Sequence, residues 1–166
     1  YLGAYAGQQT GSSATTNRNV YIGHVAGKCN SGACNIAIGD CAGCGQSSTS
    51  GSHNVFLGAL AGGAILTGGQ NIAIGCKAGL SNACGCYNIF LGSEAGKDNS
   101  SGNNNIMLGS EAGTNNTTGS HNFIGGYMAA ANATTGCCNI FLGTLAARLG
   151  VVTGNCNVVL GVYAAC

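Results

Sequence analysis

The sequence predicts an all-β fold: a parallel β-solenoid of about ten rungs of roughly 17 residues, filling residues 1–166 as a single domain. The first observation is a short unit that recurs along the whole chain. Each full copy opens with Asn, at Asn19, Asn35, Asn54, Asn71, Asn88, Asn105, Asn122, Asn139 and Asn157, and a partial copy, YLGAYAG, occupies residues 1–7. This period excludes helical repeats, which need about 34 residues or more.

The second observation is what each position of the unit holds, counted from that Asn as position 0. Position +1 is Val, Ile or Phe in every full copy, and +3 is Leu or Ile in all but one. This spacing has the period of a β-strand, and we expect +1 and +3 to face the interior. Gly at +4 permits a bend, Ala at +7 fits a narrow interior, and a Ser/Thr–Gly pair before the Asn is typical of a turn. We therefore expect about two short strands and two turns per rung, each rung stacked about 4.8 Å above the last.

The third observation is the Asn itself, which is invariant at position 0 in all nine full copies. Identical Asn side chains stacked at a bend can hydrogen-bond to one another along the axis of the solenoid, as in cross-β packing. The alternative is that Asn only tolerates the backbone dihedrals of the turn. We favour the ladder, formed by all nine residues.

Composition excludes several classes of function. Only 5% of the residues are charged and the net charge is +1, so no basic patch is available for nucleic acid. Gly and Asn interrupt every apolar run well short of the ~20 residues that a membrane-spanning helix needs, so membrane insertion is not expected. Eleven Cys residues favour an oxidising, extracellular or cell-surface location with disulfides.

Cysteine positions within the repeat suggest two pairs. Cys138 and Cys156 both occupy position −1 in consecutive rungs, which places their Cα atoms within disulfide range. Cys29 and Cys44 come close by the same reasoning. We expect the bonds Cys138–Cys156 and Cys29–Cys44.

Position +2 is expected to point outward, yet it is apolar in most rungs. A continuous exposed apolar stripe usually marks an interface, here with other copies of the chain. A stripe covered by part of the same coil is the alternative. The stripe consists of Tyr1, Tyr21, Phe56, Phe90, Met107, Ile124, Phe141 and Val159, with Ala in the remaining rungs.

Other candidate sites are weaker. Sequons at Asn99, Asn115, Asn116 and Asn132 fall on one corner of successive rungs and allow a stripe of glycans. Glu94 and Glu111 stack at +6, but too few other acids accompany them for catalysis, and we interpret them as a solvated column in which Lys77 offsets Glu94. His53 and Cys34 share a column, but two ligands do not make a zinc site. We expect no enzyme activity, metal or cofactor.

The sequence NIAIG at 35–39 and 71–75 resembles the core of the head repeats in trimeric autotransporter adhesins. TGSHN at 118–122 with NIFLG is similar to Asn/Gly-rich repeats of bacterial surface proteins and phage or giant-virus fibres. The resemblance covers the whole chain as a repeat pattern. It implies a left-handed parallel β-roll in a surface fibre.

These observations lead to an expected function. No polar cap closes either end of the repeat array in the sequence, and open strand edges favour head-to-tail addition of further copies. We expect a structural subunit of an extracellular fibre that assembles with itself and has an adhesive or matrix role. Two alternatives stay open. An ice-binding solenoid would use the Ser/Thr column, and a carbohydrate-active β-helix would need more acids than the chain has.

Overall fold

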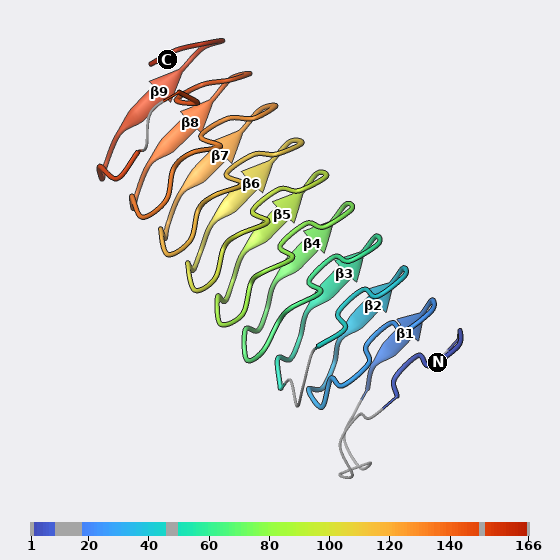
Figure 1. The fold of residues 1–166 in the computed structure, drawn as a ribbon. Coiled ribbons are helices and arrows are strands. Elements are labelled where there is room, and N and C mark those ends of the chain that lie inside the picture. Colours follow the sequence, from blue (N-terminus) through green and yellow to red (C-terminus); the bar gives the residue numbers. More distant parts are fainter. Residues whose placement is uncertain (1, 9–17, 46–49, 150–151, 166) are drawn as a thin grey trace.

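The protein is a β-solenoid in which nine short parallel strands form one sheet in sequence order (Figure 1). The structure, a computed structural model, describes residues 2–8, 18–45, 50–149 and 152–165. Each rung contributes one strand of three residues from positions +1 to +3. The strands are β1 (Val20–Ile22), β2 (Ile36–Ile38), β3 (Val55–Leu57), β4 (Ile72–Ile74), β5 (Ile89–Leu91), β6 (Ile106–Leu108), β7 (Phe123–Gly125), β8 (Ile140–Leu142) and β9 (Val158–Leu160).

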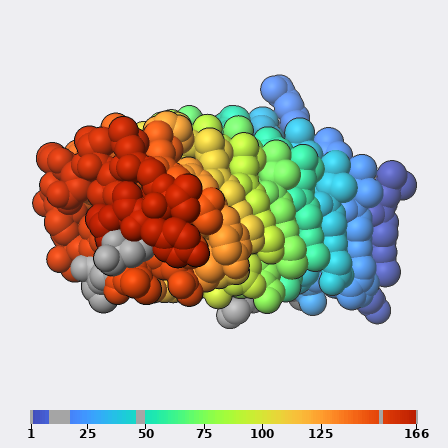
Figure 2. Space-filling model, turned by 90° about the horizontal axis from the view of Figure 1, so that it is seen from above, coloured from blue at the N-terminus to red at the C-terminus, as the bar shows by residue number. Residues whose placement is uncertain are grey.

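Every strand pairs with the next at equivalent positions of the repeat, so the register does not slip despite spacings of 16 to 19 residues. Val20 aligns with Ile36 at one end of the sheet, and Leu142 aligns with Leu160 at the other. A bridge between Leu2 and Ile22 adds the partial copy at the N-terminus to the stack. The rungs follow one another as successive bands along the rod (Figure 2).

The expectation of two strands per rung is wrong, because only +1 to +3 form a strand in the described residues. The rest of each rung consists of turns, and backbone hydrogen bonds join these turns from rung to rung. The N–H at +8 donates to the carbonyl at +7 of the next rung, as from Gly62 to Ala78 at 3.0 Å and from Gly79 to Ala95 at 2.9 Å. The backbone is therefore paired along the axis outside the sheet as well as within it.

The strands face the opposite way from the sequence prediction. Position +2 points inward and is buried, whereas +1 and +3 point outward. The predicted interface stripe is therefore the hydrophobic core: Tyr21, Phe56, Phe90, Met107, Ile124 and Phe141 are all at most 1% exposed. Val159 packs partly buried against the same core, and Tyr1 lies outside the described residues.

The core is narrow, and large and small side chains alternate at +2 from β1 to β5, where Ala37 and Ala73 lie between rungs that carry Tyr or Phe. The rings of Phe56 and Phe90 reach the preceding rung, since a Cβ on Gly43 would lie 2.8 Å from Phe56 and one on Gly79 would lie 2.6 Å from Phe90. The prediction that Ala at +7 lines a narrow interior is confirmed, since Ala61 and Ala95 have no exposed surface. At +8, a Cβ on Gly62 would lie 2.4 Å from a ring carbon of Phe56, which explains the small residues there.

Gly at +4 makes the bend at the end of each strand, as predicted. Gly92 has φ of 136°, a conformation that side chains rarely adopt. A Cβ there would lie 2.5 Å from the backbone carbonyl of Gly109 in the next rung. The rungs can therefore stack this closely only where this position lacks a side chain. The described residues include no helix long and apolar enough to cross a membrane.

Candidate functional site

The most regular feature of the molecule is a ladder of Asn side chains at position 0, which are buried from Asn35 to Asn139. The Oδ1 atom of each Asn accepts a hydrogen bond from the backbone N–H of the Asn in the next rung. All eight steps from Asn19 to Asn157 are present, with N···O distances of 2.7 to 3.0 Å. The predicted ladder is confirmed, although its main bonds run from backbone to side chain.

The amide nitrogen of each ladder Asn makes a second contact with the next rung. It donates to the carbonyl of the Gly at position −3, for example from Asn88 to Gly102 and from Asn105 to Gly119, both at 2.8 Å. The same bond forms from every ladder Asn between Asn19 and Asn139. Asn is suited to this position because a single side chain supplies one acceptor and two donors.

A second ladder lies at position +11 and was missed from the sequence. Asn99 donates to Asn82, and Asn116 donates to Asn99, both at 2.9 Å, and all three are at most 2% exposed. Each also donates to the Gly carbonyl three residues later. The ladder ends where Ala133 replaces Asn, and Oδ1 of Asn116 has no hydrogen-bond partner.

This second ladder corrects the prediction of a glycan stripe. Asn99 and Asn116 are fully buried, so a glycan on either is incompatible with the folded rung. Asn115 and Asn132 are half-buried, and their amide nitrogens already donate hydrogen bonds, from Asn115 to Oδ1 of Asn132 at 3.1 Å and from Asn132 to the carbonyl of Arg148 at 2.7 Å. The prediction is therefore wrong for Asn99 and Asn116, and glycosylation of Asn115 and Asn132 stays a prediction.

A third column, position −2, explains part of the cysteine content. A side chain at −2 accepts a hydrogen bond from a backbone N–H of the preceding rung. Cys86 and Cys137 act as acceptors through Sγ, from Gly69 and Ser120, both at 3.4 Å. The other residues in this role are Ser52, Asn103, Ser120 and Asn155. In the described residues the column holds Ser, Asn or Cys in all rungs except those of Ala33 and Gly69. Ser, Asn and Cys can each accept a hydrogen bond, and this shared chemistry is the signal that could have identified the column.

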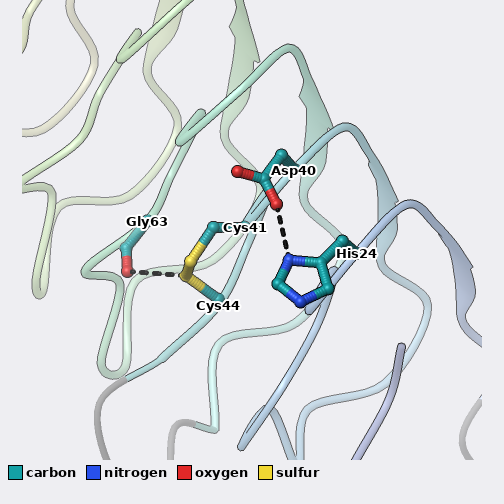
Figure 3. The surroundings of a disulfide bond; sticks show 5 residues. All are labelled: His24, Asp40, Cys41, Cys44 and Gly63. Carbon is teal, nitrogen blue, oxygen red and sulfur yellow. Dashed lines mark hydrogen bonds and ion pairs between the residues drawn. A yellow bond between two sulfur atoms is a disulfide. The ribbon is translucent and has the colours of Figure 1, made fainter. Parts of the chain in front are cut away.

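The structure contains a disulfide between Cys41 and Cys44, with Cα atoms 5.1 Å apart (Figure 3). The predicted Cys29–Cys44 bond is therefore wrong. Cys44 pairs instead with Cys41, which lies three residues earlier and is brought next to it by a turn within the same rung. The predicted Cys138–Cys156 bond is not formed, since both residues are exposed thiols. Both residues lie at left-handed backbone positions, with φ of 59° and 60°, so the two rungs repeat the same local geometry there.

Charged side chains form few pairs. Glu94 contacts Lys77 at 3.3 Å and Lys97 at 3.2 Å, which confirms that Lys77 offsets Glu94. Hydrogen bonds from Lys97 and Lys77 hold the pKa of the Glu94 carboxyl below its ordinary value. His24 and Asp40, stacked beside the disulfide, are 2.9 Å apart (Figure 3). In the described part of the chain, no three His, Cys, Asp or Glu side chains are grouped to hold a metal ion.

The outward side chains at +1 and +3 of β1–β9 make an apolar surface, called here the strand face. It consists of Ile, Val, Leu and Phe, with Gly125 as the single exception. In the middle of the stack these side chains cover one another, and Ile72 and Ile106 remain 36% and 38% exposed. The apolar stripe expected from the sequence thus exists, but at +1 and +3 and not at +2.

This side of the rod carries almost no charge. The five Lys and Arg and four Asp and Glu residues are distributed unevenly within the repeat. All of them except Arg18 lie at positions +5 to +10, in the part of each rung that follows the bend. One side of the rod, the strand face, is therefore apolar, and the side beyond the bend carries the charges. No protein family, curated protein or solved structure matches the chain.

Proposed function

We propose that the protein is a structural subunit of an extracellular fibre that assembles with copies of itself, with mechanical persistence as its function. The observation that carries this proposal is the unbroken Asn ladder from Asn19 to Asn157. Each rung is bonded to the next by the same side-chain and backbone contacts, so bending or splaying the rod would break several hydrogen bonds at every step.

Three further features support a structural role. The core is continuous and narrow, so every rung stabilises both of its neighbours. Every strand pairs with the next in the same register. A further rung of the same kind would therefore continue the ladder without rearrangement. A contact that adds copies in this way is head-to-tail and produces open filaments. The Cys41–Cys44 disulfide supports an oxidising, extracellular location.

Similarity to adhesin heads and to viral fibres belongs to the same proposal. The Asn-rich β-solenoid is the shared feature, and the adhesive or matrix role is what the likeness adds. This role requires no cofactor, no metal and no catalytic group. The partner implied by the proposal is the protein itself.

Negative-stain electron microscopy of the purified chain tests the proposal. Filaments many times longer than one chain, with a uniform width, are the expected result. Rods of single-chain length at every protein concentration would contradict self-assembly. Filament length is the measurement that decides, because it grows with end-to-end addition and not with side-by-side association.

An ice-binding solenoid is the second candidate, favoured by one observation. The Ser/Thr column at position −4 is exposed in every described rung that carries it, as at Thr118 and Thr135. Thr117, beside Thr118, is half-buried and donates its hydroxyl to the carbonyl of Thr134 at 3.1 Å, which leaves a single outward rank of hydroxyls. Thermal hysteresis by a monomeric protein would support this candidate over the fibre.

A further inference from the structure

We propose that the strand face is the lateral contact between two copies of this chain, which pair sheet to sheet along the rod. This inference rests on the proposed fibre and names the surface through which its rods associate. The occupant is a second copy of the same chain. The argument uses the charge distribution, the area and the spacing of the face.

Charge distribution identifies the strand face as the side of the rod that can be desolvated. In the described residues, the band from −1 to +4 carries one charged side chain, Arg18, next to β1. Sheets that must stay in water usually carry Lys or Glu on the exposed face, which prevents association. Here the remaining charges lie beyond the bend at +4, where they keep the other side of the rod solvated while the strand face is covered.

The area of the face matches that of a stable interface. Nine strands spaced about 4.8 Å apart extend about 43 Å along the rod, and six residues from −1 to +4 extend about 17 Å across it. The strand face together with the flanking positions −1, 0 and +4 therefore covers about 700 Å² per copy, and a pair would bury about 1,400 Å² in total. Stable, specific interfaces bury about 1,200–2,000 Å².

Spacing explains why the partner is another copy. The +1 and +3 side chains form two parallel ridges along the rod, with a groove between them over the backbone of +2. A ridge of a second copy fits that groove, and both copies have the same rung spacing. Side chains can then interdigitate over all nine strands, as in the dry contact between two stacked sheets about 10 Å apart. A partner without this repeat would match only a few rungs.

Exposure along the face agrees with a continuous surface. Ile36, Ile74 and Ile140 are 39%, 39% and 37% exposed, although they come from distant rungs. Their side chains support one another along each ridge, so the +1 ridge is continuous from β2 to β8, whereas the +3 ridge has a gap at Gly125 of β7. A cavity among the described residues lies away from this face, in the turns beside the Cys41–Cys44 disulfide. The strand face is therefore an apolar surface that is interrupted only at Gly125 of β7.

The test compares two double variants that add the same charge. Ile72→Lys with Ile106→Lys places two lysines on the strand face, at exposed sites of β4 and β6. Ala59→Lys with Ser93→Lys places two lysines at exposed +5 positions beyond the bend. Sedimentation velocity and filament width by negative stain are measured for both and for the unmodified chain, with circular dichroism as the control for folding.

The unmodified chain and the +5 variant are expected to be paired, and the strand-face variant to be unpaired, with at least a tenfold weaker lateral association. An unmodified chain that stays one rod wide at all concentrations overturns the proposal, as does a folded strand-face variant that pairs normally. If the lysines prevent folding, Ile72→Thr with Ile106→Thr keeps β-branched strand residues and answers the same question. Long filaments one rod wide would refute only the lateral contact, whereas wide but short assemblies would refute only the fibre.

Discussion

Replacing one Asn in the middle of the ladder tests whether the ladder stabilises the fold. Asn88 has no exposed surface. Its Oδ1 accepts from the N–H of Asn105 at 2.9 Å, and its Nδ2 donates to Gly102 at 2.8 Å and to Asn71 at 3.2 Å. Asn88→Ala removes all three bonds and leaves a small void between adjacent rungs.

The expected loss of stability depends on which hydrogen-bonding groups keep a partner in the Asn88→Ala variant. The carbonyl of Gly102 still accepts from Asn99 at 3.0 Å, and Oδ1 of Asn71 still accepts from the N–H of residue 88 at 2.9 Å. The N–H of Asn105 loses its acceptor and stays buried, which costs about 1–3 kcal/mol. With the void added, we expect Asn88→Ala to reduce the free energy of unfolding by about 2–4 kcal/mol.

Denaturant unfolding of the whole chain measures this loss, and amide hydrogen exchange locates it. Asn104→Ala is the matched control, because Asn104 is exposed and its side chain makes no hydrogen bond to the described residues. Its cost is confined to the left-handed φ of 56°, which Ala adopts less readily than Asn, and is expected to be about 1 kcal/mol. If the two variants lose equal stability, or if the N–H of Asn105 does not exchange faster, the ladder does not stabilise the fold as argued.

Three further predictions test the bend, the ion pairs and the thiols. Gly92→Ala, whose Cβ would clash with the next rung, is expected to reduce the free energy of unfolding by more than about 3 kcal/mol. Gly161→Ala has a similar φ, but its nearest neighbour would be 3.6 Å away, so it is expected to lose only the dihedral cost of about 1–2 kcal/mol. Equal melting temperatures of the two variants would contradict the clash. Because the pKa of Glu94 is lowered, its ion pairs contribute stability above pH about 4.5 that is lost as the pH falls through the lowered pKa. Glu94→Gln is therefore expected to remove less than about 1 kcal/mol at pH 7 and to flatten the acid side of the stability curve, while Glu111→Gln, which breaks no salt bridge of the described residues, leaves it unchanged. Iodoacetamide is expected to modify Cys138 in the native, unreduced protein, and a disulfide-linked peptide containing Cys138 in the mass spectrum would show otherwise.

The orientation of the strands shows where sequence reasoning failed and what could have corrected it. In strands such as Ile89–Leu91 all three residues are apolar, so hydrophobicity does not distinguish the two faces. The prediction buried the face with two apolar positions, +1 and +3, in preference to the face with one, +2, and this choice was wrong. Because side chains alternate along a strand, Asn at 0 and +2 share a face. A buried Asn ladder therefore requires +2 to be buried as well, and the two predictions made here were inconsistent.

The sequence by itself determined the period, the parallel solenoid, the Asn ladder and the bend at Gly +4. It could do so because stacking places equivalent positions of the repeat in contact, so that each column reports one local environment. The tertiary structure alone decided the direction of the side chains, the second ladder at Asn82–Asn116 and the Cys41–Cys44 pairing. These depend on how the turns fold back within one rung, where the backbone dihedrals set which side chains converge. The apolar strand face follows from the same closure, which buries +2 and leaves +1 and +3 outside.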